Sequence, residues 1–238
     1  IGNIARILPR QNELIRPAVA NIDQALVIFA IVKPEPNFQL LDRFLIMMEQ
    51  QGLSCIVCFN KLDIASVGER ENLQKAYGSC GYRVLFTSAE KGEGMEELRR
   101  LLYGKTTAVA GPSGVGKSSI INCLNPDAGM ETGEISRKID RGKHTTRHSE
   151  IIALQENTYI MDTPGFTSLR LFSMEKEDLQ GFYPEFARYE GHCRFTGCSH
   201  LSEPDCGVKQ ALAEGKISPV RYENYKDLYR ELQEQKKY

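Results

Sequence analysis

The sequence has no excess of charge of either sign. Thirty Lys and Arg residues face thirty-one Asp and Glu residues in 238, which gives a formal net charge of −1. This balance excludes the overall basic field typical of non-specific nucleic-acid binders, so any such contact must be local. The chain also lacks an apolar run of eighteen or more residues, and it lacks a charged start followed by an apolar stretch and a cleavage site. We therefore expect neither a membrane span nor export, and a cytoplasmic location.

A disulfide scaffold is also missing, because seven cysteines are an odd number and no secretory signal accompanies them. Cys55, Cys58, Cys80 and Cys123 lie in apolar or mixed surroundings. Cys55 and Cys58 form a C-x-x-C pair, but positions i and i+3 of a strand face opposite sides of a sheet. We predict buried thiols rather than a metal or redox pair at these four positions.

Short apolar runs alternate with amphipathic stretches from Asp23 to about Met161. The runs are QALVIFAIV, SCIVCFN, YRVLFTS, KTTAVAG and NTYIMDT. This alternation predicts βαβ units and a doubly wound α/β domain with a mostly parallel sheet. Residues 1–20 form short strand fragments at most. After about Arg170 the strand pattern ends, and stretches at 174–191, 207–215 and 219–238 predict helices around a Cys/His-rich segment. We expect three parts, at residues 1–20, 21–170 and 171–238.

The segment GPSGVGKSS matches the phosphate-binding pattern G-x-x-x-x-G-K-[ST]. It follows the apolar run TTAVA and precedes the helical SIINCL, which is the strand, loop and helix context that the pattern requires. Backbone N–H groups would surround the phosphates, Lys117 would reach the β and γ oxygens, and Ser118 would coordinate Mg²⁺. The predicted contacts are Gly111, Pro112, Ser113, Gly114, Val115, Gly116, Lys117, Ser118 and Ser119.

The segment NKLD, at the end of an earlier buried run, predicts that the base is guanine. Asn60, Lys61 and Asp63 would lie at the carboxyl edge of the sheet, where open α/β sheets bind ligands. A carboxylate there accepts from both guanine N1–H and the exocyclic amine, and adenine offers no such donor pair. Ser88 and Ala89, at the end of the next strand, would place a backbone N–H on guanine O6.

The segment DTPG predicts the γ-phosphate end of the site. Asp162 would hold Mg²⁺ through water, and the Gly165 N–H would face the γ-phosphate. The polar, basic stretch SRKIDRGKHTTRHSE precedes it, and Thr145 or Thr146 there would complete the Mg²⁺ shell. Its part from Arg137 to His148 carries five basic residues and one acid, a local footprint compatible with a phosphate backbone.

The position after the DTPG glycine holds Phe166, which cannot orient an attacking water as the glutamine of many GTPases does. The nearest polar candidate is His144, whose neutral imidazole would accept from the water. We predict His144 as the catalytic residue; the alternative is a loop histidine in contact with solvent or RNA.

Three cysteines and one histidine lie within fourteen residues of the tail, at Cys193, Cys198, His200 and Cys206. Three thiolates and an imidazole suit tetrahedral Zn²⁺, and four protein ligands are typical of a closed structural site. His192 is a rival ligand, but it neighbours Cys193 and would strain a shared tetrahedron.

These motifs together resemble the bacterial small-ribosomal-subunit-dependent GTPase A family, a family of circularly permuted GTPases. The features that carry the resemblance are PAVANIDQALVIFA, NKLD, TSAEKGEG, GPSGVGKSS, GKHTT, DTPGF and C-x4-C-x-H-x5-C, and they span almost the whole chain in the family's order.

The resemblance implies an N-terminal OB-fold, of which residues 1–20 resemble only the last strand and exit, then a permuted GTPase domain and a zinc domain. It also implies GTP hydrolysis stimulated by the 30S subunit in late 30S maturation, with GTP, GDP, the 30S subunit and 16S rRNA as partners of a monomer. It points to the same His144 and to the same four zinc ligands.

Two further functions stay open from the sequence. The chain could be a GTP-dependent binding module for the ribosome with negligible hydrolysis of its own, an alternative that Phe166 keeps alive. A P-loop enzyme that uses ATP is the third candidate.

Overall fold

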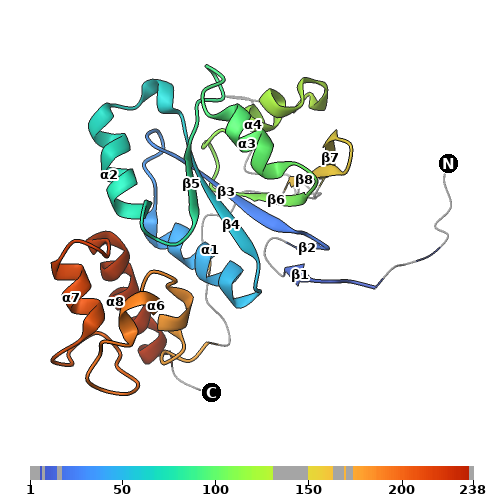
Figure 1. Cartoon of the computed structure of the whole chain (residues 1–238). Helices are drawn as coiled ribbons and strands as arrows, with labels where there is room; N and C mark the ends of the chain where they lie inside the picture. The colour runs from blue at the N-terminus through green and yellow to red at the C-terminus, as the bar shows by residue number, and fades with distance from the viewer. Residues whose placement is uncertain are drawn as a thin grey trace.

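A parallel sheet forms the centre of the molecule (Figure 1). The computed structural model describes residues 6, 9–14, 18–130, 150–162, 169 and 174–235. Within them, six strands form one sheet in the order β5-β4-β3-β6-β8-β7, in which only β7 runs antiparallel to its neighbour. The strands are β3 (Gln24–Ala30), β4 (Ser54–Asn60), β5 (Arg83–Phe86), β6 (Thr106–Ala110), β7 (Glu150–Gln155) and β8 (Thr158–Asp162).

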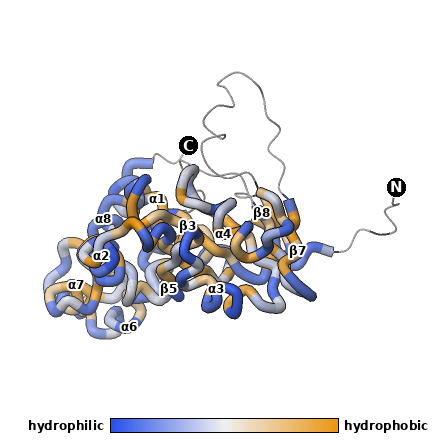
Figure 2. Tube along the Cα trace, turned by 90° about the horizontal axis from the view of Figure 1, so that it is seen from above, coloured by the Kyte–Doolittle hydropathy of each residue, from blue (hydrophilic) through white to orange (hydrophobic). Residues whose placement is uncertain are grey.

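Helices cover the sheet on both faces because its central strands are buried on both sides. Every residue of β3 is buried, with Val27 and Phe29 facing one hydrophobic cluster and Leu26 and Ile28 facing another. The first cluster includes residues of α1 (Phe38–Gln50) and α2 (Val67–Tyr77), and the second includes residues of α3 (Met95–Leu102) and α4 (Lys117–Leu124) (Figure 2). The doubly wound α/β prediction is therefore confirmed.

The cysteines of β4 separate as the period of a strand requires. Cys55 lies in the cluster under α1 and α2, whereas Cys58 lies in the cluster under α3 and α4. Cys80 is buried as well, and Cys123 is half-buried. The C-x-x-C sequence thus forms no pair, as predicted.

Side-chain caps set where the first two helices begin. The Asn37 side chain accepts from the Leu40 N–H at 2.9 Å at the start of α1. Ser66 and Glu69 form a reciprocal capping box at the start of α2, a helix that the apolar pattern did not indicate. A short 3-10 turn, η1 (Leu62–Ile64), lies between β4 and α2, and a second, η2 (Pro126–Ala128), follows α4.

The strand β7 is a second element that was not predicted from the sequence. It is an edge strand, and of its six residues only Ile152 is buried. Its short apolar run, Ile151–Leu154, lies directly after a long polar stretch, and its other side chains are exposed or half-buried. Near the N-terminus, β1 (Glu13–Leu14) pairs with β2 (Val19–Ala20), and Leu14 packs against the cluster under α1.

The C-terminal part has a hydrophobic cluster that Ile46 of α1 also joins, and it has no strand within residues 174–235. It contains η3 (Leu179–Phe182), α6 (Ala187–Glu190), α7 (Gly207–Ala213) and α8 (Pro219–Glu234). The stretch 174–191, predicted as helical, contains two short helical elements, η3 and α6, rather than one long helix. Pro184 lies between them, and a proline inside a helix removes a hydrogen bond and clashes with the preceding turn.

A buried ionic cluster joins α8 to α1 and α2, the helices that cover one face of the sheet. Arg221 is fully buried and donates to Asp42 of α1 at 2.5 Å and to Glu185 at 2.7 and 3.1 Å. Asn224 also donates to Asp42, at 2.6 Å, as does the Tyr77 hydroxyl at 2.9 Å. The C-terminal part therefore lies against α1 and α2 through specific polar contacts (Figure 1).

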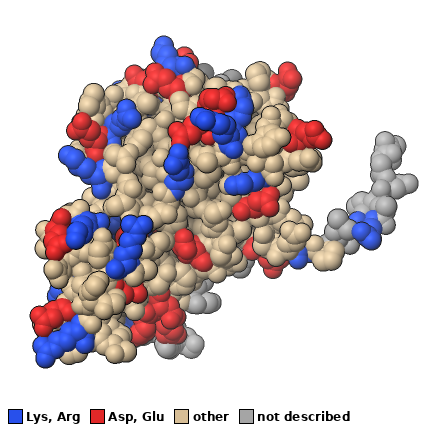
Figure 3. Space-filling model, in the orientation of Figure 1, with Lys and Arg blue, Asp and Glu red and all other residues tan. Residues whose placement is uncertain are grey.

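The surface agrees with the balanced composition. Basic and acidic side chains are interspersed on the face shown in Figure 3. Among the described residues, no helix has both the length and the apolar character needed to cross a bilayer.

Candidate nucleotide site and metal centre

The carboxyl ends of β4, β5 and β6 bring three predicted segments to one edge of the sheet. The buried Asn60 side chain links them, since its Nδ2 donates to the Val115 carbonyl at 3.0 Å while its Oδ1 accepts from the Ala89 N–H at 3.2 Å. Thr87, which the sequence analysis did not single out, also donates to Asn60 Oδ1 at 3.2 Å. One side chain thus connects the phosphate loop to both base-side segments, although the phosphate loop comes later in the chain.

Two glycines of the phosphate loop are required by space. A Cβ on Gly111 would lie 2.1 Å from the Ile28 carbonyl oxygen of β3, and a Cβ on Gly116 would lie 2.4 Å from Asn60 Nδ2. Both have positive φ angles, 148° and 94°, which glycine adopts most readily. No described side chain caps the start of α4, so its first N–H groups can serve an anion.

Lys117 lies across this loop. Its Nζ donates to the carbonyls of Gly111 at 2.9 Å and Pro112 at 2.8 Å. Burial lowers the pKa of Lys117, and the nearby charge of Asp162 at the end of β8 opposes that shift. Phosphate oxygens would replace the two carbonyls as partners and would favour the charged ammonium.

The residues predicted for Mg²⁺ fall into two groups. Ser118 is the second residue of α4. Asp162 is the last residue of β8, and β8 pairs with β6, the strand that leads into the phosphate loop. Thr145, Thr146, Gly165 and the proposed catalytic His144 lie outside the described residues, as does Phe166.

The base side of the site is held by Lys61, Asp63 and Ser88. Lys61 adopts a left-handed backbone conformation, and its Nζ donates to the Gly114 carbonyl at 2.7 Å and to the Lys33 carbonyl. The Ser88 hydroxyl donates to Asp63 Oδ1 at 2.5 Å, which orients an exposed carboxylate. The two predicted guanine-reading segments and the phosphate loop therefore meet at one sheet edge.

Comparison with known proteins agrees with this arrangement. The family model described as RsgA GTPase matches residues 7–172, which is more than half of the chain. The chain belongs to the RsgA GTPase family. As a member of it the chain is a GTPase, and the predicted family resemblance is confirmed.

Relatives of this RsgA GTPase match it along nearly its whole length. A protein of Agathobacter rectalis named small ribosomal subunit biogenesis GTPase RsgA is 64% identical over 238 residues, which cover all of this chain and 79% of the relative. A protein of the same name from Caldanaerobacter subterraneus is 47% identical over 236 residues, which cover 99% of this chain and 80% of the relative.

Two solved structures are also similar. The crystal structure of YjeQ from Thermotoga maritima has a TM-score of 0.81 and 35% identity, and the match covers 97% of this chain and 78% of that one. The structure of YloQ, described as a circularly permuted GTPase, has a TM-score of 0.77 and 35% identity. The match covers 98% of this chain and 76% of YloQ. The predicted permuted GTPase fold is thereby confirmed, and it explains why the base-reading strand precedes the phosphate loop.

The C-terminal part of this RsgA-family chain brings Cys193, Cys198, His200 and Cys206 together. One potential ligand atom from each lies within 4.8 Å of the others, and His192 is not in this group. The Cys193 and Cys206 sulfurs are 3.8 Å apart, and His200 Nδ1 lies 3.6 and 3.3 Å from them. A zinc tetrahedron with Zn–S of about 2.3 Å and Zn–N of about 2.0 Å has edges of roughly 3.8 Å between sulfurs and 3.5 Å from nitrogen to sulfur. The four residues fit the metal.

The protonation of His200 suits a cation, whereas the Cys198 thiol must lose its proton to bind one. Burial lowers the pKa of His200, which favours the neutral imidazole that binds metals. Burial also raises the pKa of the Cys198 thiol to about 12. A bound cation would displace that proton and stabilise the thiolate.

Side chains outside the ligand set fix the loop that carries His200. Glu203 accepts from the Ser199 N–H and hydroxyl and from the Leu201 N–H, at 2.8, 2.6 and 3.0 Å. Burial would raise the pKa of Glu203, but these hydrogen bonds outweigh it and hold the pKa at about 2. Tyr222 and Tyr225 of α8 donate to the carbonyls of His200 and Ser199, at 2.5 and 2.7 Å. The helix that packs on α1 thus also supports the metal loop.

Proposed function

We propose that this chain hydrolyses GTP to GDP and phosphate as a switch in the maturation of the small ribosomal subunit. The observation that carries the nucleotide part is the single side chain of Asn60, which connects the phosphate loop to the base-side segments. The names of the relatives, which describe small ribosomal subunit biogenesis, support the ribosomal part.

Each part of the site has a proposed role. The loop from Gly111 to Ser119 holds the phosphates with its N–H groups, and Lys117 exchanges its carbonyl partners for phosphate oxygens. Asp63 accepts from the guanine, and Ser88 orients it. The Ala89 N–H would contact O6 and is shared with Asn60, whereas the Ser88 N–H donates to the Glu93 carbonyl at 3.0 Å.

Mg²⁺ and the attacking water complete the proposed reaction. Ser118 and Asp162, with Thr145 or Thr146, would hold the ion, which when bound neutralises the charge on the phosphates. The Gly165 N–H would contact the γ-phosphate. His144 would accept a hydrogen bond from the water and orient it for attack on the γ-phosphorus.

We further propose that Cys193, Cys198, His200 and Cys206 hold a structural Zn²⁺ and that residues 171–238 form a separate zinc domain after the GTPase domain at 21–170. The C-terminal hydrophobic cluster, whose buried members apart from Ile46 of α1 all come from residues 179–232, supports that division. Metal analysis of protein purified without added zinc should find about one equivalent. A content far below one equivalent would refute the zinc assignment.

The ribosomal proposal is tested by GTP turnover with and without purified 30S subunits. Strong stimulation by 30S subunits supports a switch that contacts the subunit and its 16S rRNA. Equal turnover in both conditions, with GTP-dependent co-sedimentation retained, would favour instead the binding module without hydrolysis of its own. A matched assay with 50S subunits controls for non-specific effects of RNA.

A further inference from the structure

His200 has a second ring nitrogen that the metal would not use. Its Nδ1 faces the Cys193 and Cys206 sulfurs, so a metal bound there leaves the proton on Nε2. The His200 side chain is almost fully buried, and Nε2 has no hydrogen-bond partner among the described residues. A buried N–H without a partner costs about 1–3 kcal/mol, so this donor needs an acceptor.

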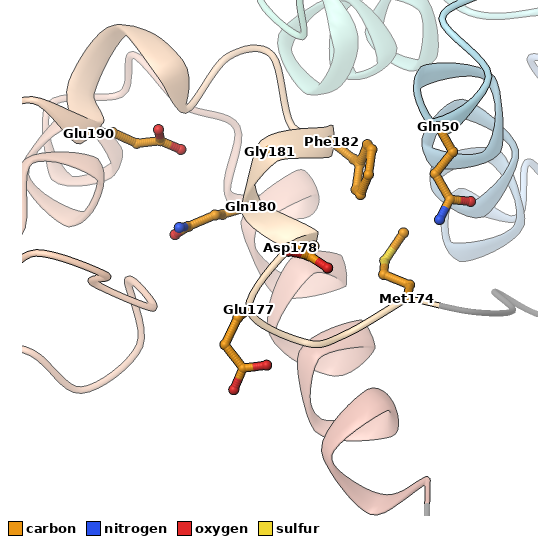
Figure 4. Close-up of a pocket in the computed structure, with 8 residues that line it drawn as sticks. All are labelled: Gln50, Met174, Glu177, Asp178, Gln180, Gly181, Phe182 and Glu190. Carbon is orange, nitrogen blue, oxygen red and sulfur yellow. The ribbon is translucent and has the colours of Figure 1, made fainter. Parts of the chain in front are cut away.

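The acidic group beside Nε2 is Glu190, the last residue of α6. Its Oε1 lies 3.9 Å from His200 Nε2, about 1 Å beyond hydrogen-bonding distance. The side chain is 36% exposed and lines a hollow of about 420 Å³ between η3 and the end of α1 (Figure 4). In Figure 4 its carboxylate extends into this open space, so the side chain has room to turn.

The backbone of α6 is already fixed to the metal loop. The Glu190 carbonyl accepts from the Cys193 N–H at 3.0 Å, and the Tyr189 carbonyl lies against Gly207, where a Cβ would be only 2.3 Å away. Phe186, at the start of the same helix, packs edge-on against the His200 ring. Glu190 is therefore anchored beside the ligands by its main chain, and only its side chain must move.

We propose that Glu190 is a positioning residue of the metal centre, which accepts the Nε2–H of His200 and so selects the tautomer that binds metal through Nδ1. With a cation held at Nδ1, that N–H would be a stronger donor and the Glu190 carboxylate would turn toward it. Carboxylate partners of this kind fix the orientation of metal-binding histidines, and their loss costs roughly 10–100-fold in metal affinity. The inference rests on the zinc site proposed above.

The test is a zinc titration of the whole chain against a chromophoric chelator. Glu190→Ala should bind Zn²⁺ about 10–100-fold more weakly than the unchanged protein, and Glu190→Gln, which keeps an acceptor oxygen, should lose less. Glu177→Gln is the matched control, because Glu177 lines the same hollow without contacting His200. It should bind zinc as the unchanged protein does.

A second readout follows the tautomer itself. Long-range ¹⁵N–¹H spectra should identify the Nε2–H tautomer of His200 in the zinc-loaded protein, and in Glu190→Gln the Nε2 resonance should move. Equal zinc affinity for Glu190→Ala and the unchanged protein would overturn this inference alone. Absence of zinc binding by the unchanged protein would overturn the zinc site as well, so the two failures are distinct.

Discussion

Replacing Arg221 by methionine removes the positive charge at the centre of the cluster that joins α8 to α1. Methionine keeps much of the volume, so the change is mainly one of charge and hydrogen bonding. It leaves Asp42 and Glu185 as neighbouring buried carboxylates, with exposures of 0% and 4%. The guanidinium also packs 4.5 Å from the centre of the Tyr183 ring, a contact that the variant loses.

The expected cost follows from the burial of the partners. Removing one member of a buried ion pair typically costs 3–5 kcal/mol, because the remaining charge is left uncompensated. We therefore expect Arg221→Met to lower the free energy of unfolding by about 3–5 kcal/mol at pH 7, a large share of the 5–15 kcal/mol of a typical domain.

The loss should depend on pH. Burial already raises the pKa of Asp42, and Arg221 opposes that rise together with the hydrogen bonds from Asn224 and Tyr77. Without Arg221 the pKa rises further, so Asp42 takes up a proton in the folded variant as the pH falls. A carboxyl whose folded-state pKa lies above its unfolded value destabilises the fold increasingly as the pH rises. The free energy of unfolding that the variant loses should therefore be largest near pH 8 and smallest near pH 5.

Urea unfolding followed by circular dichroism measures both effects, since the chain has no tryptophan for fluorescence. Arg230→Met on the same helix is the matched control, because Arg230 pairs with Asp227 on the surface with 65% of its side chain exposed. It should cost less than about 1 kcal/mol. A loss for Arg221→Met no larger than that of the control, or one independent of pH, would refute the reasoning.

Three further predictions concern the nucleotide site. Gly116→Ala should weaken GDP binding at least about tenfold in a fluorescent-nucleotide titration, because the added Cβ would lie 2.4 Å from Asn60 Nδ2 and the residue has a positive φ. The control is Gly68→Ala in α2, where a Cβ has open space, and it should bind GDP as the unchanged protein does. His144→Ala should keep GTP affinity and lose about 100-fold or more of the turnover stimulated by 30S subunits, and unchanged turnover would contradict its role. Lys61→Met should weaken GDP binding by disconnecting Lys33 from Gly114, whereas equal affinity would show that this link is dispensable.

The sequence predicted the parts of the molecule whose signals are continuous along the chain. The strands around Val27, Val57, Val109 and Ile160 are apolar runs, and the phosphate loop and NKLD are short motifs at strand ends. Because parallel strands place their carboxyl ends at one edge, these motifs were also predicted to converge. The four metal-site residues were grouped because they lie within fourteen residues of one another in the sequence.

What escaped the sequence depends on contacts between distant or unmarked residues. Arg221 and Asp42 are 179 positions apart, and nothing local marks either as buried. Thr87 became part of the site only once its hydroxyl was seen to reach Asn60 across neighbouring strands. At 174–191 the helical spacing of apolar residues was outweighed by Pro184. In β7 the apolar run Ile151–Leu154 is only four residues long and adjoins a polar stretch, so it was missed.

The central claim is that a chain with reversed motif order still assembles one guanine-nucleotide site. Calorimetric titration of the protein with GDP and with ADP tests it most directly. Two hydrogen bonds to a charged carboxylate are worth at least about 3 kcal/mol, so GDP should bind at least about 100-fold more tightly than ADP. Asp63→Ala should remove most of that preference. Equal affinities for GDP and ADP, or a preference that survives Asp63→Ala unchanged, would contradict the account.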